Sequence, residues 1–227
     1  MSKARLSGLQ ILLTEDHVTT RLGIKQILQE AFRGVVFGEA GTARETFALL
    51  ETRAWDLVIL DINLPDRHGL DVLQEVWQRW PAVPVLIYSA HPEDQFAVHG
   101  VRAHAAGYLT KERAPEELAI AVRTIMSGGK YLSPWLAARL AEGGIAGRGG
   151  LPHEALSERE FQVLRLSAAG KAGKTIAGEL GLSEKTVSTY RIRVMKKLRV
   201  ASGAELVRYA VRHGLVGEPA RKVGSTI

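Results

Sequence analysis

The sequence predicts an α/β domain built on a doubly wound, five-stranded parallel sheet, followed by a small all-α domain. Three observations predict it. Five short apolar runs alternate with amphipathic stretches up to about residue 130, only helical patterns follow, and a glycine-rich stretch separates the two parts. Strands that alternate with helices indicate a parallel sheet covered by helices on both faces. The length of 227 residues allows one to two domains.

The five apolar runs are short, aliphatic or β-branched, and end at polar or turn residues, as buried strands do. They are Leu9–Thr14, Val35–Ala40, Leu57–Leu60, Val85–Ser89 and Gly107–Leu109. Since a helical pattern follows each of them, we expect all five strands to be parallel.

The intervening stretches have helical periodicity. They are Val18–Ala31, Ala43–Thr52, Gly69–Trp80, Glu93–Gly100 and Pro115–Ser127. In the first of them, Leu22, Ile24, Ile27 and Leu28 are expected to form one buried face. Pro81 and Pro84 bracket the end of the third helix.

The second part begins with a short helix over Ser133–Leu140, capped by Ser133, and a flexible linker with five glycines between Glu142 and Gly150. Four helices are expected after it, over Glu158–Ala169, Lys174–Leu180, Glu184–Arg199 and Ala204–His213. Ser157 and Glu160 form a capping box, and Ser183 caps a later helix without an acidic partner. We therefore expect domains at residues 1–132 and 155–217, with a short helix and linker at 133–154 and a tail at 218–227.

The charge is distributed unevenly. Residues up to Leu132 carry 14 Lys/Arg and 16 Asp/Glu, a net −2, whereas the rest carries 16 and 8, a net +8. A basic part favours nucleic acid as a partner. The chain has no cysteine, which excludes disulfides and thiolate catalysis, and no apolar run long enough to span a membrane, so we expect a cytoplasmic protein without a membrane partner.

Polar residues stand at the carboxyl ends of four predicted strands. Glu15 and Asp16 follow the first strand, Asp61 the third, Ser89 ends the fourth, and Lys111 follows the fifth. Ligands bind at this edge of open α/β sheets, so we expect these side chains to converge.

Three carboxylates in one small volume repel one another, by about 4 kcal/mol for a pair 4 Å apart at an effective dielectric constant near 20. A hard cation such as Mg²⁺ relieves that repulsion and also accepts phosphate oxygens. A carboxylate can act as a nucleophile in aspartyl-phosphate chemistry. The pocket is therefore suited to an incoming phosphoryl group.

The basic part contains a helix, a tight turn at Gly181 and a second helix, which is the helix-turn-helix layout. On the second helix Val187, Val194 and Leu198 share the face expected to pack on the domain. The opposite face carries Lys185, Ser188, Thr189, Ile192 and Lys196, with Arg193 alongside. Small and basic residues on an outward face suit the major groove of double-stranded DNA. A solvated basic face on a core helix is the alternative.

Residues 9–132 resemble the receiver domain of two-component response regulators, which is flavodoxin-like. The resemblance rests on Glu15-Asp16, on Asp61 to Gly69, on Ser89-Ala90 and on Tyr108 to Lys111. It implies that Asp61 accepts the phosphoryl group, that Asp16, Asp61 and the Asn63 carbonyl bind Mg²⁺ directly, and that Glu15 holds metal-bound water. It further implies that Lys111 and Ser89 contact the phosphoryl oxygens and that Tyr108 is the aromatic switch residue. Arg67-His68 departs from the usual apolar residues of that loop, which leaves the packing of the loop open.

Residues 155–215 are similar to LuxR-type DNA-binding domains, through Leu156 to Glu160, Ile176-Ala177, Lys185 to Val187 and the residues near them. Both parts together resemble the NarL/FixJ subfamily of response regulators. The resemblance implies a dimer on DNA through the last helix, with Ser188, Thr189 and Ile192 facing bases. The candidate DNA-binding residues are Lys174, Lys185, Thr186, Ser188, Thr189, Tyr190, Ile192, Arg193, Lys196 and Lys197.

The implied function is a transcription regulator that a partner histidine kinase phosphorylates on Asp61, with phosphorylation controlling homodimerisation and promoter binding. In this mechanism Ser89 and the loop after it move toward the phosphate, and Tyr108 turns inward. Two alternatives remain open at this point. One is a Mg²⁺-dependent phosphatase or transferase with an appended nucleic-acid module, and the other is a constitutive DNA-binding protein whose first domain only dimerises.

Overall fold

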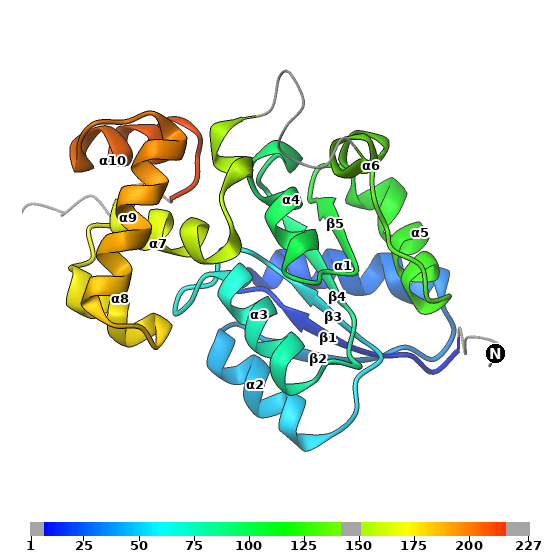
Figure 1. Cartoon of the computed structure of the whole chain (residues 1–227). Helices are drawn as coiled ribbons and strands as arrows, with labels where there is room; N and C mark the ends of the chain where they lie inside the picture. Colours follow the sequence, from blue (N-terminus) through cyan, green and yellow to red (C-terminus); the bar gives the residue numbers. More distant parts are fainter. Residues whose placement is uncertain (1–6, 142–150, 217–227) are drawn as a thin grey trace, which may run out of the picture. The chain divides into compact units, whose positions relative to one another are not determined.

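The computed structural model describes residues 7–141 and 151–216, and the glycine-rich linker predicted at 142–150 lies outside them (Figure 1). The chain divides into two compact units, Met1–Ala141 and Glu142–Ile227. Within the described residues, no helix combines the length and the apolar character that crossing a membrane requires.

The first unit contains the predicted five-stranded parallel sheet. Its strands are β1 (Gln10–Thr14), β2 (Val36–Ala40), β3 (Leu57–Leu60), β4 (Val85–Ser89) and β5 (Gly107–Thr110), in the spatial order β2-β1-β3-β4-β5. From β1 the chain first leads to β2 on one side, and then to β3 on the other. The strand order therefore reverses at β1, and the carboxyl ends of β1 and β3 lie side by side at this point, where ligands bind in such folds.

Helices cover both faces of the sheet (Figure 1). Helices α1 (Val18–Ala31) and α5 (Ala114–Met126) pack together over a core of buried aliphatic residues on one face. Helices α2 (Ala43–Thr52), α3 (Gly69–Arg79) and α4 (Glu93–Arg102) lie on the other face. The predicted fold class is confirmed, and most element ends differ from the prediction by one or two residues, as helix and strand ends commonly do.

The predicted buried face of α1 is wrong in one member. Ile24 and Leu28 are buried and Ile27 packs against the core, but Leu22 is 54 % exposed. Residues two apart on a helix point about 200° away from each other, so Leu22 and Ile24 cannot share a face.

Helix α6 (Pro134–Ala141) belongs to the first unit and packs on α4. The Ser133 hydroxyl accepts a hydrogen bond from the backbone N–H of Leu136, as its predicted capping role requires, and also donates to the Glu93 carboxylate in the first turn of α4. Leu136 is fully buried. The last helix of this unit is thus tied to the start of α4.

In the described residues of the second unit, all regular secondary-structure elements are helices. They are the 3₁₀ helix η1 (Pro152–Ala155), which the sequence pattern does not predict, and the helices α7 (Glu158–Ala168), α8 (Gly173–Leu180), α9 (Glu184–Leu198) and α10 (Gly203–Arg212). The capping box of Ser157 with Glu160 and the cap at Ser183 are confirmed. Gly181 has a φ of 65° between α8 and α9, in the left-handed region that glycine favours, so the predicted tight turn is present.

Two residues, Gly69 and Asp66, hold the loop between β3 and α3 in place. At Gly69 a Cβ atom would lie 2.3 Å from the Asp61 carbonyl oxygen and 2.6 Å from the Ile62 Cα, so only glycine fits. The Asp66 carboxylate accepts hydrogen bonds from the backbone N–H groups of Ala43 and Arg44, at 2.9 and 3.1 Å, and so caps α2. Burial opposes the charge of Asp66, but these hydrogen bonds outweigh it and lower its pKa.

The two unusual residues of this loop, Arg67 and His68, pack on neighbouring helices. Arg67 pairs with Glu75 on α3 at 2.5 Å and lies over the Phe47 ring of α2. The His68 Nδ1 accepts a hydrogen bond from the Leu70 N–H, and the His68 ring packs on Phe96 of α4. Both residues therefore anchor the loop to the helices around it.

We predict that Gly69→Ala lowers the free energy of unfolding by about 1–3 kcal/mol, because the added methyl group collides with backbone atoms. Gly23→Ala is the matched control, since the Cβ at this position in α1 meets nothing within 4 Å and alanine favours a helix by up to about 1 kcal/mol. Urea denaturation of the two variants measures both effects. A Gly69→Ala protein as stable as the wild type would contradict the assigned close contact.

Candidate phosphoryl and nucleic-acid sites

The ends of β1, β3 and β5 bring three predicted residues into direct contact. The Lys111 ammonium lies 2.6 Å from a carboxylate oxygen of Glu15 and 2.9 Å from one of Asp61. The Glu15 and Asp61 side chains are 2 % and 3 % exposed. Two carboxylates are therefore buried together beside one cation, as the sequence predicted.

The charges of this group depend on one another. Burial raises the pKa of Asp61, and although Lys111 opposes this, the pKa stays above its usual range. For Lys111, burial works against the charged form, but the hydrogen bonds to Glu15 and Asp61 outweigh it and raise its pKa. The ammonium is therefore firmly protonated, and a further cation near Asp61 would favour its ionised, nucleophilic form.

Asp16 lies next to this pair, beside His17, which no sequence pattern singled out. The His17 Nδ1 is 2.9 Å from Glu15 and 2.7 Å from Asp16. The hydrogen bond with Glu15 and the charge of Asp16 raise the pKa of His17. Glu15, Asp16 and His17 each offer a ligand atom within 4.8 Å of the others.

The donor set fits a hard divalent cation. Glu15, Asp16 and Asp61 supply carboxylate oxygens, and the backbone N–H of Asn63 donates to Asp61 at 3.3 Å, which places Asn63 directly beside the phosphoacceptor candidate. Mg²⁺ takes such oxygen ligands together with water and phosphate oxygens. The oxygen atoms of Glu15, Asp16 and Asp61 therefore suit a magnesium ion, and the His17 nitrogen lies within 4.8 Å of the ligand atoms of Glu15 and Asp16.

Ser89 at the end of β4 and Tyr108 in β5 both hydrogen-bond the backbone of His91. The fully buried Ser89 hydroxyl accepts a hydrogen bond from the His91 N–H at 3.1 Å, and the Tyr108 hydroxyl donates to the His91 carbonyl at 3.0 Å. Tyr108 is itself fully buried, and burial raises its pKa. The aromatic ring is therefore already turned inward in this structure.

His91 is a second residue that sequence patterns missed. Its Nε2 lies 3.0 Å from the side-chain amide of Asn63, and its Nδ1 lies 3.0 Å from Gln95 on α4. No motif pointed to it, because its contacts join segments far apart in the sequence. It connects the loop after β3 with the loop after β4.

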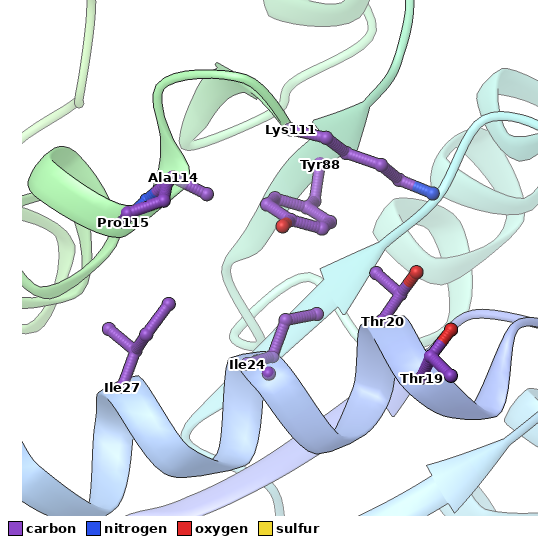
Figure 2. A pocket seen from close by; sticks show the side chains of 9 residues that line it. Thr19, Thr20, Ile24, Ile27, Tyr88, Lys111, Ala114 and Pro115 are labelled. Atoms are coloured by element: carbon purple, nitrogen blue, oxygen red, sulfur yellow. The ribbon is translucent and has the colours of Figure 1, made fainter.

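A hollow of about 350 Å³ lies beside the pocket, between α1 and the start of α5 (Figure 2). Lys111 crosses its rim with the ammonium directed away from Ala114 and Pro115 (Figure 2). The ammonium lies 5.7 Å from the centre of the Tyr88 ring, a cation–π contact. Tyr88 thus supports the lysine while the two carboxylates hold its end.

In the second unit, α9 presents the predicted faces. Val187, Val194 and Leu198 are buried, at 1 %, 0 % and 4 % exposure. The residues predicted to face outward are exposed: Lys185, Ser188, Thr189, Ile192, Arg193 and Lys196. Ile192 is 67 % exposed, so its side chain is available on the outward face of α9.

The other candidate DNA contacts differ in their surroundings. Lys174 is exposed at the start of α8, whereas Tyr190 is partly buried against the core of this unit. The Thr186 hydroxyl bonds to Ser183, and Thr189 donates to the Lys185 carbonyl. Both hydroxyls retain a free lone pair with which they can accept a further hydrogen bond.

Lys197 has a different role from its neighbours. Its ammonium lies 2.6 Å from the Glu160 carboxylate and 3.2 Å from the Ala155 carbonyl oxygen, which ties α9 to η1 and to the start of α7. The structure therefore separates Lys197 from Lys185 and Lys196, which make no such internal contact among the ion pairs of the described residues.

A buried carboxylate pair with a lysine, at the switch point of a parallel sheet, followed by a basic helix-turn-helix unit, defines a receiver coupled to a DNA-binding domain. Residues 11–123 match the family of response regulator receiver domains, and residues 154–210 match the bacterial regulatory proteins of the luxR family. The chain belongs to the NarL/FixJ subfamily of response regulators. Receiver domains of this kind generally bind Mg²⁺ in the acidic pocket.

Two curated relatives span nearly the whole chain. Response regulator UvrY of Escherichia coli K12 is 33 % identical over 208 residues, covering 91 % of this chain and 95 % of the relative. Response regulator GacA of Pseudomonas aeruginosa is 34 % identical over 209 residues, covering 92 % and 98 %.

The fold has a solved counterpart. The structure of RcsB from Salmonella enterica serovar Typhimurium, bound to promoter rprA with phosphomimetic BeF₃⁻, has a TM-score of 0.72 at 22 % identity, covering 89 % of this chain and 98 % of that one. At this identity the likeness concerns the fold alone.

We predict that Lys197→Met lowers the stability of the second unit by about 0.5–1 kcal/mol at pH 7, because it leaves the Glu160 carboxylate without its cation. Lys196→Met, one residue earlier and exposed, is the matched control and changes stability by less than about 0.5 kcal/mol. Hydrogen exchange of α7 and α9 amides in the full chain measures both.

The effect of Lys197→Met also depends on pH. Burial opposes the charge of Glu160, but Lys197 and the Ser157 hydrogen bonds outweigh it, so the pKa of Glu160 is lowered in the folded protein. Its contribution to stability is full above the unfolded-state pKa of about 4.3 and is lost as the pH falls through the lower folded value. The difference between wild type and Lys197→Met should therefore shrink below about pH 4. A difference that stays constant from about pH 7 to about pH 3 would contradict the ion pair.

Proposed function

We propose that this protein is a transcription regulator that accepts a phosphoryl group on Asp61 from a partner histidine kinase, and that phosphorylation controls homodimerisation and promoter binding. The cytoplasm is the proposed location, because the protein would encounter both the phosphorylated histidine of the kinase and chromosomal DNA there. The division into domains at residues 1–132 and 155–217 is part of this proposal, with the helix of the connecting segment 133–154 packed on the first domain.

One observation carries the proposal above all others. Asp61 is buried at the carboxyl edge of the sheet and shares the Lys111 ammonium with Glu15. A purely structural aspartate at this position would cap a helix or pair with one cation in solvent. A second buried carboxylate next to it is costly in the resting protein and becomes useful when a metal and a phosphoryl group arrive.

The chain's own residues divide the work of phosphoryl transfer. An Asp61 carboxylate oxygen attacks the phosphorus atom, the bond from phosphorus to the donor's imidazole nitrogen breaks, and the donor histidine leaves. Asp16, Asp61 and the Asn63 carbonyl would hold Mg²⁺ directly and Glu15 would hold its water. The bound cation would neutralise charge on the transferring group. Lys111 and Ser89 would contact the phosphoryl oxygens.

The phosphoryl group adds a charge of about −1.5 to −2 and three acceptor oxygens. The Ser89 hydroxyl, which now accepts from the His91 N–H, would donate to one of these oxygens. The Tyr108 hydroxyl donates a hydrogen bond to the carbonyl of the same His91. A shift of this segment would therefore strain or break that bond, while the ring of Tyr108 is already buried. The proposed switch is therefore a change in the segment between Ser89 and α4 that Tyr108 stabilises, rather than a rotation of Tyr108 from solvent.

For DNA, we propose that α9 enters the major groove with Ser188, Thr189 and Ile192 toward the bases. Ile192 can contact a thymine methyl group but cannot donate or accept a hydrogen bond. Dimerisation through α10 agrees with the exposed Val207 and Val211 on that helix, at 37 % and 48 %. The residues proposed to contact the DNA backbone or support the helix are Lys174, Lys185, Thr186, Tyr190, Arg193 and Lys196.

The enzyme alternative is not supported, because the families matched by both parts are regulators. A constitutive DNA-binding protein remains the second candidate. Titration of the full chain with Mg²⁺ separates the two, since a first unit that only dimerises has no need to bind the metal.

We predict that Asp61→Asn abolishes phosphoryl acceptance from acetyl phosphate, measured by intact-protein mass or by radiolabel. Asp56→Asn is the matched control, because Asp56 lies at the opposite end of the same strand and hydrogen-bonds the Gln10 N–H. It should label like the wild type. Unchanged labelling of Asp61→Asn would overturn the assigned acceptor.

For DNA binding, we expect that Lys185→Ala combined with Lys196→Ala weakens binding to all sequences. The slope of log K against log salt concentration should fall by about one for each lysine that no longer pairs with a phosphate. Arg33→Ala combined with Lys130→Ala removes the same charge from exposed positions of the first unit and should leave the slope unchanged. Equal slopes for the two double variants would contradict the role of α9.

Phosphorylation control is tested on the wild type with beryllofluoride as the phosphoryl mimic. It should raise the DNA affinity of the full chain and shift the chain to a dimer in sedimentation. A protein that binds DNA equally well and keeps the same oligomeric state with and without beryllofluoride would favour the constitutive alternative.

A further inference from the structure

Arg21, in the second turn of α1, makes two contacts that neither motif nor pattern predicts. Its guanidinium donates one hydrogen bond to the backbone carbonyl of Glu15. It donates another to the Glu39 carboxylate, at 3.0 Å. Its side chain is 15 % exposed, and the bond to the Glu15 carbonyl is partly buried, whereas the bond to Glu39 lies at the surface. Arg21 thus joins α1 to the ends of β1 and β2.

The bond to the Glu15 carbonyl matters because this carbonyl belongs to the peptide that joins Glu15 to Asp16. This carbonyl and the N–H of Asp16 belong to one planar peptide unit. Fixing the carbonyl therefore fixes the orientation of the peptide that links the two acidic residues. The other side of Glu15 is held as well, since its N–H donates to the Ala40 carbonyl at 2.9 Å.

Glu39 is the acidic partner of the Arg21 guanidinium. Its carboxylate takes Arg21 on one oxygen and the Lys25 ammonium on the other, at 2.6 Å. The two cations lower the pKa of Glu39, the hydrogen bond from Lys25 being the larger cause. Arg21 thus pairs with the carboxylate of Glu39, and at Glu15 it contacts the backbone carbonyl.

We infer that Arg21 is a positioning residue for the divalent cation of the phosphoryl site, acting through the Glu15–Asp16 peptide and with Glu39 as its counter-ion. The inference rests on the proposed function, because it concerns the same metal. Removing a residue that holds a metal ligand in place typically changes metal affinity by about 10–100-fold. Because the bond here is to the backbone, we expect the lower end of that range.

The test is a Mg²⁺ titration of the full chain at constant ionic strength, followed by the backbone amide signals of Glu15 and Asp16. Arg21→Ala should raise the Mg²⁺ dissociation constant about tenfold. Lys25→Ala is the matched control, since it removes the other cation on Glu39 but keeps the bond to the Glu15 carbonyl. Its dissociation constant should stay within about twofold of the wild type.

Two further variants keep the inference testable if Arg21→Ala is poorly folded. Arg21→Lys retains a cation that can reach either partner but lacks the planar fork that holds both, so its Mg²⁺ affinity should lie between wild type and Arg21→Ala. Glu39→Gln removes the counter-ion and leaves the guanidinium charge beside the acids, so it should also weaken Mg²⁺ binding. Thermal unfolding of each metal-free variant reports structural damage separately.

The Mg²⁺ affinities of these variants decide whether Arg21 has the inferred role. Weakened Mg²⁺ binding in Arg21→Ala and Glu39→Gln with near-normal binding in Lys25→Ala supports the inference. Normal Mg²⁺ affinity in Arg21→Ala overturns it, even if the midpoint of unfolding falls, and so does an equal loss of affinity in Lys25→Ala. If the wild type itself binds no Mg²⁺, the proposed metal site fails, and the inference fails with it.

Discussion

The contact of Lys111 with both Glu15 and Asp61 is the interaction on which the rest of the first unit's site depends. It places one cation between two almost fully buried carboxylates, at distances of 2.6 and 2.9 Å. Without that cation their repulsion in a partly buried site would favour protonation of one of them. The lysine therefore keeps an acidic pocket assembled in the resting protein, with Tyr88 supporting it from one side.

Hydrogen bonds to backbone groups hold the segments around this pocket. Arg21 holds the Glu15 carbonyl, Asp66 caps α2, and Tyr108 holds the His91 carbonyl. Under the proposed function, a change at Asp61 would therefore alter whole segments and not single side chains. The segment after β4 leads directly into Glu93, which hydrogen-bonds Ser133 at the start of α6, the last helix of this unit.

The second unit shows the same separation of structural and functional charge. Lys197 and Glu160 form an internal pair that fastens α9 to α7, and Lys185 and Lys196 remain exposed on the outward face. Three lysines within one helix thus divide into one that holds the helix and two that are available to phosphates. The net charge of this unit does not reveal that division.

The sequence by itself determined the sheet, its helices, the helix-turn-helix and the meeting of Glu15, Asp61 and Lys111 at one edge of the sheet. Strands and helices follow from local periodicity, and polar residues at strand ends meet because parallel strands end on one edge. Only the tertiary structure decided the places of His91, Arg21 and Lys197 and the inward position of Tyr108. Their partners are backbone atoms or side chains distant in sequence, and no local pattern encodes a contact whose other half is a carbonyl group or a residue on another element.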